Sequence, residues 1–368
     1  MNSLEKLAYF NWAGISPALP EVRGAMAAAE FEFERRGWLS QEGLAFFGEQ
    51  LWECRRAVGE LLGVMDEKTI ALTQNASEAI NIVLQGLRKH LKLVVTTDQE
   101  HPSAEMSLKL LAQDSVSVKI IPFTDQETFI ECLKKEVSSE PGLIFLSHIS
   151  YKNGAELPIH EVAKLAHEKG WRVFADGAQA VGQLSVRVQD LGVDFYAFSG
   201  HKWLFGPMGT GALWVKRDLI PTIQLIQAGW RSKRPLDDAS RFEVGTTNIA
   251  LAAGLSEAAR LADTSELTRR SRISRDMKSR IYQYLAGLRE IKILSQNESP
   301  TGILSFQHPR GNHLELAKRA ADEHRVIIKP ITPPEFPESL RVSFSYLNTT
   351  SELDRLTKCL HDLFFDDF

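Results

Sequence analysis

Between residues 69 and 215, short apolar segments rich in β-branched and aromatic residues alternate with segments of helical periodicity. The strand-like segments are residues 69–73, 91–97, 116–122, 142–147, 172–175, 193–198 and 211–215. Strands separated by helices pair in parallel through right-handed crossovers, with helices on both faces of the sheet. The pattern therefore predicts an α/β fold with a mostly parallel seven-stranded sheet. The short connection before residues 211–215 predicts that this last strand is antiparallel.

Polar residues follow these strands, at the edge where sheets of this kind bind ligands. They are His101, His148, Asp176, Ser199 and Lys202. Because the carboxyl ends of parallel strands share one edge, we expect these residues to form one site. Residues 74–78 join a strand to a helix, and the backbone N–H groups of such a turn suit a phosphate. The alternative is an ordinary capped helix, with Asn75 or Ser77 as the N-cap.

Asp176 and Lys202 suit pyridoxal phosphate (PLP), since a lysine carries this cofactor as a Schiff base and an acid keeps its pyridine nitrogen protonated. Small residues before Lys202 allow a cofactor to approach, and apolar residues after it favour a lowered lysine pKa. Asp176 could instead cap the following helix, and most lysines are solvated surface residues. The shared position of the two residues at strand ends favours the cofactor interpretation.

The rest of the sequence predicts three regions. Residues 1–20 form an N-terminal arm that packs on the small domain, residues 21–255 form the large cofactor-binding domain, and residues 256–368 form a small α+β domain. Residues 249–288 are expected to be one long helix that leads into the second domain. Residues 330–337, which are rich in proline, are expected to line the entrance of the site.

Composition excludes several classes of function. The net charge is −4 with scattered Lys and Arg, which gives no broad footprint for nucleic acid. No signal peptide or membrane-spanning segment is evident, so a cytoplasmic protein without membrane contact is expected. The three cysteines, Cys54, Cys132 and Cys359, are too few and too far apart for a disulfide framework or a zinc site, and no metal is expected.

Four motifs carry a resemblance to a known family. They are Glu100-His101, Asp176-Gly177-Ala178-Gln179, Ser199-Gly200-His201-Lys202 and Phe242-Glu243-Val244-Gly245-Thr246. In order and spacing they resemble the class V aminotransferases of PLP fold type I, and in particular their cysteine desulfurase-like group. The resemblance extends over nearly the whole chain, and it implies a homodimer.

The resemblance implies a role for each matching position. Lys202 would bind PLP covalently, Asp176 would pair with the ring nitrogen, Gln179 would contact the phenolic oxygen and His101 would stack on the ring. The phosphate would be bound by Ser199, His201, the turn at Ala76 and Ser77, and Thr246 of the partner subunit. The substrate contacts would be Arg341, which holds the carboxylate as a bidentate pair, together with Tyr151 and Trp230.

The departures from the family pattern bear on the reaction. Desulfurases carry a nucleophilic cysteine shortly before the position of Arg341, whereas residues 329–337 contain no cysteine. Without a thiolate, sulfur cannot be transferred to the enzyme there. Ala76 replaces the usual threonine, and Tyr151 replaces an asparagine. Residues 229–232 and 241–244 look most like the cystine and cysteine C–S lyases of the group.

We therefore expect a C–S lyase that eliminates a β-thiolate from cysteine, cystine or a cysteine conjugate, with Lys202 as the base. Transamination, epimerisation and decarboxylation-linked chemistry remain alternatives, because they share Lys202 and Asp176. A desulfurase that uses a distant cysteine and a non-catalytic scaffold are the other two alternatives.

Overall fold

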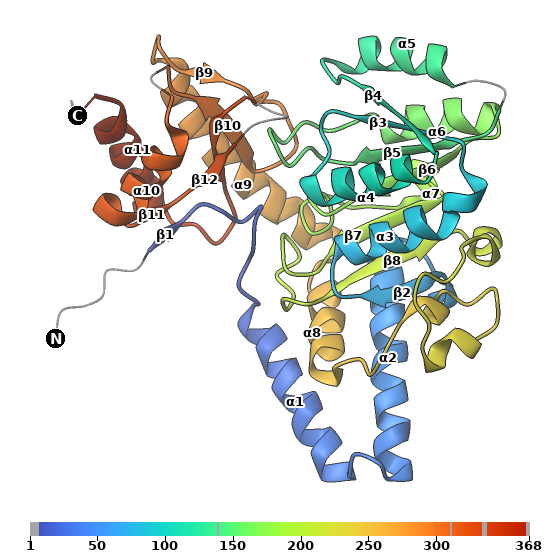
Figure 1. Ribbon diagram of the computed structural model, residues 1–368. Coiled ribbons are helices and arrows are strands. Elements are labelled where there is room, and N and C mark those ends of the chain that lie inside the picture. Colours follow the sequence, from blue (N-terminus) through green and yellow to red (C-terminus); the bar gives the residue numbers. More distant parts are fainter. Residues whose placement is uncertain (1–6, 138–139, 310, 333–336, 366–368) are drawn as a thin grey trace. The chain divides into compact units, whose positions relative to one another are not determined.

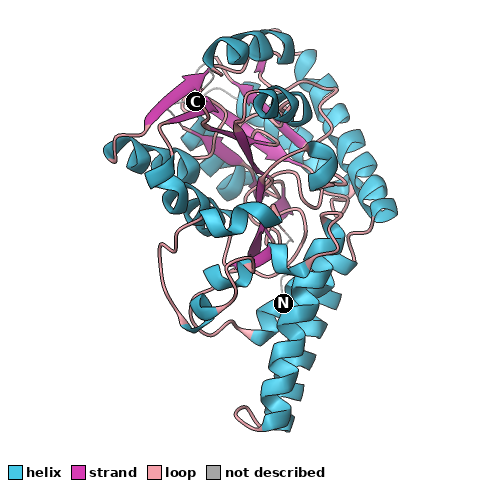
Figure 2. Cartoon of the chain, turned by 90° about the vertical axis from the view of Figure 1, so that its right-hand side faces the viewer, coloured by secondary structure: helices cyan, strands magenta, loops and turns pink. Residues whose placement is uncertain are grey.

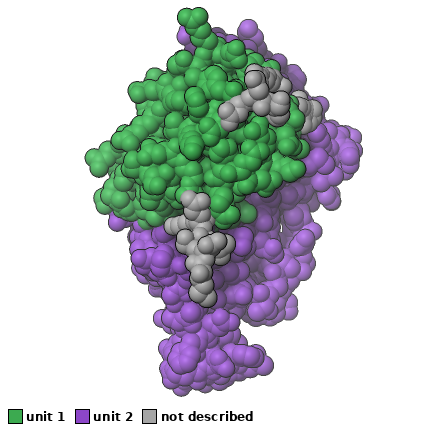
Figure 3. Space-filling model, turned by 90° about the vertical axis from the view of Figure 1, so that its left-hand side faces the viewer, with its two compact units in different colours: residues 1–16, 150–156, 265–368 green, residues 17–149, 157–264 purple. Residues whose placement is uncertain are grey.

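The computed structural model describes residues 7–137, 140–309, 311–332 and 337–365. The chain divides into two compact units, which Figure 3 shows in different colours. Unit 1 comprises Met1–Ser16, Ser150–Glu156 and Ser265–Phe368, and unit 2 comprises Pro17–Ile149 and Leu157–Thr264. Each unit has a hydrophobic core of its own.

Unit 2 is built on a seven-stranded sheet with the order β2-β8-β7-β6-β5-β3-β4. The strands are β2 (Ile70–Thr73), β3 (Leu93–Thr97), β4 (Ser117–Ile121), β5 (Leu143–Ser147), β6 (Arg172–Asp176), β7 (Phe195–Ser199) and β8 (Gly211–Val215). Strand β8 is antiparallel to both of its neighbours, and all other pairs are parallel. The predicted mostly parallel sheet and its antiparallel last strand are therefore confirmed.

Helices cover this sheet on both faces (Figures 1 and 2). Every residue of β5, β7 and β8 is buried, as expected for strands that are covered on both sides. The helices along the sheet are α3 (Ala76–Leu87), α4 (Pro102–Gln113), α5 (Gln126–Glu136), α6 (Ile159–Glu168) and α7 (Val188–Leu191). Helices α1 (Pro20–Arg36) and α2 (Gln41–Leu61) both pack against α8 (Ile249–Arg260).

Unit 1 contains an antiparallel sheet with the order β12-β13-β10-β9 and a two-stranded parallel sheet of β1 and β11. Its strands are β1 (Ala8–Tyr9), β9 (Lys292–Ile293), β10 (Ile303–Gln307), β11 (Val326–Ile327), β12 (Lys329–Ile331) and β13 (Ser339–Ser343). Its helices are α9 (Thr264–Ala286), α10 (His313–His324) and α11 (Thr350–Phe365). The N-terminal arm is tied to this unit because Ala8 and Tyr9 pair with Val326 and Ile327.

The structure differs from the sequence expectations in three places. The single helix expected over residues 249–288 is wrong: α8 ends at Arg260, where the amide of Ala262 bonds to Ala259 in a tight final turn, and α9 begins at Thr264. Residues 150–156 belong to unit 1, and the expected domain boundary at residue 255 falls inside α8. Helix α4 was not expected; it begins at Pro102, a residue favoured at the first position of a helix. No helix in the described part of the chain is long and apolar enough to cross a membrane.

Candidate active site

Asp176 ends strand β6 and is almost completely buried. Its carboxylate Oδ1 accepts a hydrogen bond from the amide of Ala178 at 2.9 Å. Gly177 allows the chain to turn here, because a Cβ at this position would lie 2.2 Å from the ring of Tyr196. Burial raises the pKa of Asp176, while the nearby charge of Lys202 lowers it. The acid and the lysine that were expected to share a site therefore lie within electrostatic reach of each other.

Lys202 lies in the turn after β7, and this turn is fixed on both sides. The carbonyl of Lys202 accepts a hydrogen bond from the amide of Phe205 at 3.0 Å. The next residue, Trp203, donates its indole N–H to Oε1 of Gln179 at 2.7 Å. Gln179 follows β6, so this bond joins the loops after two neighbouring strands, the loop with Asp176 and the loop with Lys202.

The turn before α3 lies against the same loops. The Oδ1 of Asn75 caps the helix by accepting from the amide of Glu78 at 2.9 Å, and the amide of Ala76 donates to the hydroxyl of Ser199 at 3.0 Å. Gly211 allows this approach, because a Cβ there would lie 2.9 Å from Cα of Asn75. The turn is thus both a capped helix and an N-terminus next to Ser199, with Asn75 rather than Ser77 as the cap.

The buried Nδ1 of His201 has no hydrogen-bond partner among the described residues. The amide of Ser77 belongs to the first turn of α3, and the hydrogen bond of Asp176 to Ala178 uses Oδ1. An amide at a helix N-terminus and a neighbouring imidazole are suitable ligands for a phosphate. A buried carboxylate oxygen is a suitable acceptor for a protonated pyridine nitrogen. The residues present therefore fit PLP.

His101 and Glu100 follow β3. His101 is the N-cap residue of α4, and its Nδ1 accepts a hydrogen bond from the amide of Ser103 at 3.2 Å. Glu100 is fully buried and bonds to the hydroxyls of Thr97 and Ser147. The sequence reasoning assigned no role to Glu100 itself, although an acid in the short loop after an apolar strand was a visible signal.

His148, at the end of β5, is also buried in this region. Its Nδ1 lies 2.8 Å from the hydroxyl of Tyr196, and its amide donates to the carbonyl of Asp176 at 2.8 Å. Burial lowers the pKa of His148 to about 4. The imidazole is therefore neutral at neutral pH and adds no charge beside Asp176.

Arg341 and Tyr151 lie together in unit 1. The guanidinium of Arg341 donates from Nη1 to the carbonyl of Tyr151 at 2.8 Å and from Nη2 to Oδ1 of Asn11 at 3.0 Å. Its Nε is buried without a partner, and within the described chain no carboxylate pairs with it. Burial lowers the pKa of Arg341 to about 10. Asn11 was missed by the sequence reasoning, because nothing in the arm marks it as a partner of Arg341.

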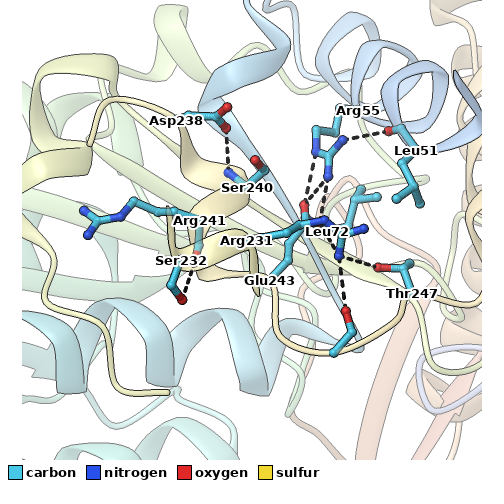
Figure 4. A network of polar contacts seen from close by, with 11 residues as sticks. Leu51, Arg55, Leu72, Arg231, Ser232, Asp238, Ser240, Arg241, Glu243 and Thr247 are labelled. Carbon is cyan, nitrogen blue, oxygen red and sulfur yellow. Dashed lines mark hydrogen bonds and ion pairs between the residues drawn. The ribbon is translucent and has the colours of Figure 1, made fainter. Parts of the chain in front are cut away.

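Trp230 and Thr246 lie on the segment of residues 229–248, which is held in place by the network in Figure 4. The carboxylate of Glu243 binds Arg55 of α2 at 2.8 and 2.7 Å and accepts from the amide of Leu72 at 3.0 Å. The two expected ligand residues are on the surface: Trp230 is 77% exposed and Thr246 is exposed. In the described chain, neither makes a hydrogen bond or ion pair with the Lys202 cluster.

The loop that was expected to line the entrance, residues 330–337, lies partly outside the described residues, which omit 333–336. In the part of the chain that the structure describes, no group of three or more His, Cys, Asp or Glu side chains could hold a metal ion.

Comparison with known proteins gives a consistent assignment. The family model of the class V aminotransferases matches residues 40–356. A probable cysteine desulfurase of Mycolicibacterium paratuberculosis is 28% identical over 82% of this chain, which spans 47% of that protein. A second, of Methanothermobacter thermautotrophicus, is 26% identical over 85% of this chain and 84% of its own length.

Two similar solved structures are of one enzyme, the cystine C–S lyase C-DES. Its complex with the reaction product cysteine persulfide has a TM-score of 0.88, 26% identity and 98% coverage of both chains. A variant with glycine covalently linked to its PLP cofactor has a TM-score of 0.87 and 26% identity, and covers 98% of this chain and 97% of its own. These structures confirm the expected α/β fold with a separate small sheet.

Proposed function

Because the chain belongs to the class V aminotransferase family of PLP-dependent enzymes, we propose that it is a C–S lyase that acts on cysteine, cystine or a cysteine conjugate. Proteins similar to this chain include both a C–S lyase and probable cysteine desulfurases, and we propose the reaction of the lyase. The choice depends on the cysteines of this chain.

The absence of a suitable thiol supports the lyase over the desulfurase. Residues 329–337, which precede Arg341, contain no cysteine. Burial raises the pKa of Cys54 and of Cys359 to about 12, so neither is a nucleophilic thiolate at neutral pH. The third, Cys132, is a half-buried residue of α5. A reaction that leaves sulfur on the product needs none of these thiols.

The residues that would hold PLP are those of the cluster described above. The amide of Ser77, His201 and Ser199 would bind the phosphate, with Ala76 contributing only the backbone of the turn. Asp176 would keep the ring nitrogen protonated through its second oxygen, Gln179 would lie against the phenolic oxygen and His101 would cover one ring face. PLP supplies a covalent link to the substrate amino group and a sink for the electron pair released at Cα.

The chain itself then provides binding and proton transfer. Arg341 would hold the substrate carboxylate as a charge-assisted pair, with Tyr151 and Trp230 as further substrate contacts. Lys202 would take the Cα proton as general base. The Cβ–S bond breaks and its electron pair leaves with sulfur, as sulfide from cysteine or as cysteine persulfide from cystine. Hydrolysis of the remaining enamine gives pyruvate and ammonia.

A homodimer is part of the proposal. Thr246 is exposed on a segment that is fixed by buried ion pairs, and such a segment can present a hydroxyl to a second subunit without rearrangement. We therefore propose that Thr246 completes the phosphate site of the partner subunit.

A desulfurase is the second candidate, because several relatives are named cysteine desulfurase or probable cysteine desulfurase. The two reactions differ in their carbon product, since elimination gives pyruvate whereas sulfur transfer to an enzyme thiolate gives alanine.

Product analysis of the purified holoenzyme tests the proposal. Cysteine, cystine and S-substituted cysteines would each be incubated with wild-type protein, with Lys202→Ala and with the triple variant Cys54→Ser, Cys132→Ser and Cys359→Ser. We expect pyruvate and ammonia in equal amounts, unchanged turnover in the triple variant and no turnover in Lys202→Ala. Alanine as the carbon product, or loss of turnover in the triple variant, would support the desulfurase. A keto acid formed with pyridoxamine phosphate would support an aminotransferase.

A further inference from the structure

Glu100 is a buried carboxyl group in the second layer around the cofactor site. Its side chain has no exposure to solvent. Oε1 lies 2.6 Å from the hydroxyl of Thr97, at the end of β3, and Oε2 lies 2.7 Å from the hydroxyl of Ser147, at the end of β5. Glu100 thus bridges two neighbouring strands directly behind the residues that are expected to face the cofactor.

No opposite charge compensates Glu100. Among the described residues, no Lys, Arg or His side chain forms an ion pair or hydrogen bond with it, including the adjacent His101 and the neighbouring His148. The charged group that acts on it is Asp176, and this group has the same sign. An isolated buried carboxylate is strongly unfavourable, and two carboxyl groups in one buried site do not both ionise readily.

The geometry indicates which of the two acids carries the charge. Asp176 and Ser147 are cross-strand partners in register, so Glu100 reaches the position next to Asp176 through the Ser147 hydroxyl. Asp176 is stabilised as an anion by the attraction of Lys202 and by the amide of Ala178. The partners of Glu100 are all uncharged: they are the hydroxyls of Thr97 and Ser147 and the backbone amide of Ser147. A neutral carboxyl can accept from one hydroxyl and donate to the other, so it satisfies both contacts without a charge.

We propose that Glu100 is a protonated positioning residue, which fixes Ser147 beside Asp176 and leaves Asp176 as the charged member of this buried pair of acids. This inference depends on the proposed cofactor role of Asp176 but not on C–S elimination. Burial, with a smaller contribution from Asp176, raises the pKa of Glu100 to about 8. A carboxylic acid kept neutral at pH 7 by an apolar site is a known device in enzymes.

Infrared spectroscopy of the holoenzyme tests the charge state directly. Glutamate labelled with ¹³C in the carboxyl group separates this signal from Asp176. Glu243, the other glutamate that is buried in the described part of the chain, is ion-paired with Arg55. We expect a protonated-carboxyl band at pH 6–7 that disappears above about pH 8 and is absent from Glu100→Gln. A wild-type spectrum at pH 6 with carboxylate bands alone would overturn the proposal.

Binding of PLP to the apoprotein tests the positioning role. Glu100→Gln retains shape and neutrality, so its dissociation constant for PLP should stay within about threefold of wild type. Glu100→Leu removes both hydrogen bonds and leaves the hydroxyls buried, so its dissociation constant should rise about tenfold or more. A folded Glu100→Gln protein that binds as weakly as Glu100→Leu would show that the charged form is required. Wild-type affinity in folded Glu100→Leu would show that Glu100 positions nothing. If Glu100→Leu does not fold, the infrared spectrum of the wild type and the PLP dissociation constant of Glu100→Gln still test whether Glu100 is protonated. The carbon product of the reaction is a separate measurement, so the lyase proposal can fail independently.

Discussion

At the scale of single residues, the most informative property of this protein is burial of ionisable groups without an opposite charge. Arg341, His148 and Glu100 are all buried, and in the described chain neither Arg341 nor Glu100 forms an ion pair with a group of opposite charge. Burial alone favours the neutral form of each group. The imidazole and the carboxyl can respond by staying neutral, whereas the guanidinium keeps its charge and therefore needs an anion from outside the chain.

The first prediction concerns Arg341. Replacement by alanine removes the cation that is proposed to hold the substrate carboxylate, and should lower kcat/KM by roughly 100-fold or more, which corresponds to about 3 kcal/mol. Arg341→Lys keeps the positive charge but loses the planar guanidinium with its paired donors. Its kcat/KM should therefore lie between those of the wild type and Arg341→Ala. PLP affinity should be unchanged. Arg289→Ala, a change at an exposed residue of the same unit, serves as the control. Equal kcat/KM in wild type and Arg341→Ala would remove Arg341 from the substrate site.

The second prediction concerns pH and His148. The pKa of His148 is about 4 in the folded protein and 6.5 when unperturbed, so the unfolded chain binds the extra proton first. Stability from this residue is complete above pH 6.5 and is lost as the pH falls through 4, by up to about 3 kcal/mol. His148→Gln has no imidazole to protonate and so lacks this loss. The difference in free energy of unfolding between His148→Gln and the wild type should therefore shift in favour of the variant as the pH is lowered from 7 to 4. Urea unfolding at several pH values measures the difference. His90→Gln, at an exposed position, should show no such trend.

At the scale of elements, the segment of residues 229–248 contains only two short 3-10 helices and is anchored by the ion pairs of Glu243. Glu243 is bound by Arg55 from α2, contacts Arg231 at 3.7 Å and accepts from the backbone of β2. Arg231 in turn donates to the carbonyl of Gly245 and the hydroxyl of Thr247 at 3.3 Å. One carboxylate therefore anchors the segment to both a helix and the sheet.

The third prediction follows from this anchor. Glu243→Ala leaves two mostly buried arginines without their carboxylate and should lower the free energy of unfolding by about 3–5 kcal/mol. Glu60→Ala, on the same helix α2 as Arg55, removes an exposed ion pair with Arg56. It should lower the free energy of unfolding by less than about 1 kcal/mol. Denaturant unfolding of the three proteins gives the comparison. A loss as small as that of Glu60→Ala would mean that other contacts hold the segment.

The elements also show what the sequence could predict. The strands of the large sheet and the polar residues near their ends followed from apolar runs, because the expected site residues lie at or within a few residues of the strand ends. The break between α8 and α9 did not follow, since both helices have helical composition and only the final turn of α8 separates them. Glu100 and Asn11 were not assigned roles, because a role in burial or in holding another side chain depends on tertiary contacts that have no local pattern.

At the scale of the whole molecule, the proposed cofactor site draws on residues of two subunits. Asp176, Gln179, Ser199 and Lys202 meet within a single unit of one chain, whereas Thr246 is exposed and joined to none of them. Two-fold association would allow each subunit to supply Thr246 to the other, because a two-fold interface repeats every contact reciprocally.

Subunit mixing tests this arrangement. Lys202→Ala and Thr246→Asp should each be inactive, the second because a carboxylate would repel the cofactor phosphate. In mixed dimers, one of the two sites receives Lys202 from one subunit and Thr246 from the other, so roughly a quarter of all sites should recover after random exchange. Lys202→Ala mixed with Asp176→Ala is the matched control, because these residues belong to the same site of one chain and no exchange restores both. Recovery in the first mixture alone supports Thr246 acting across the interface. If neither mixture recovers although mass spectrometry shows that mixed dimers have formed, Thr246 acts within its own chain or not at all.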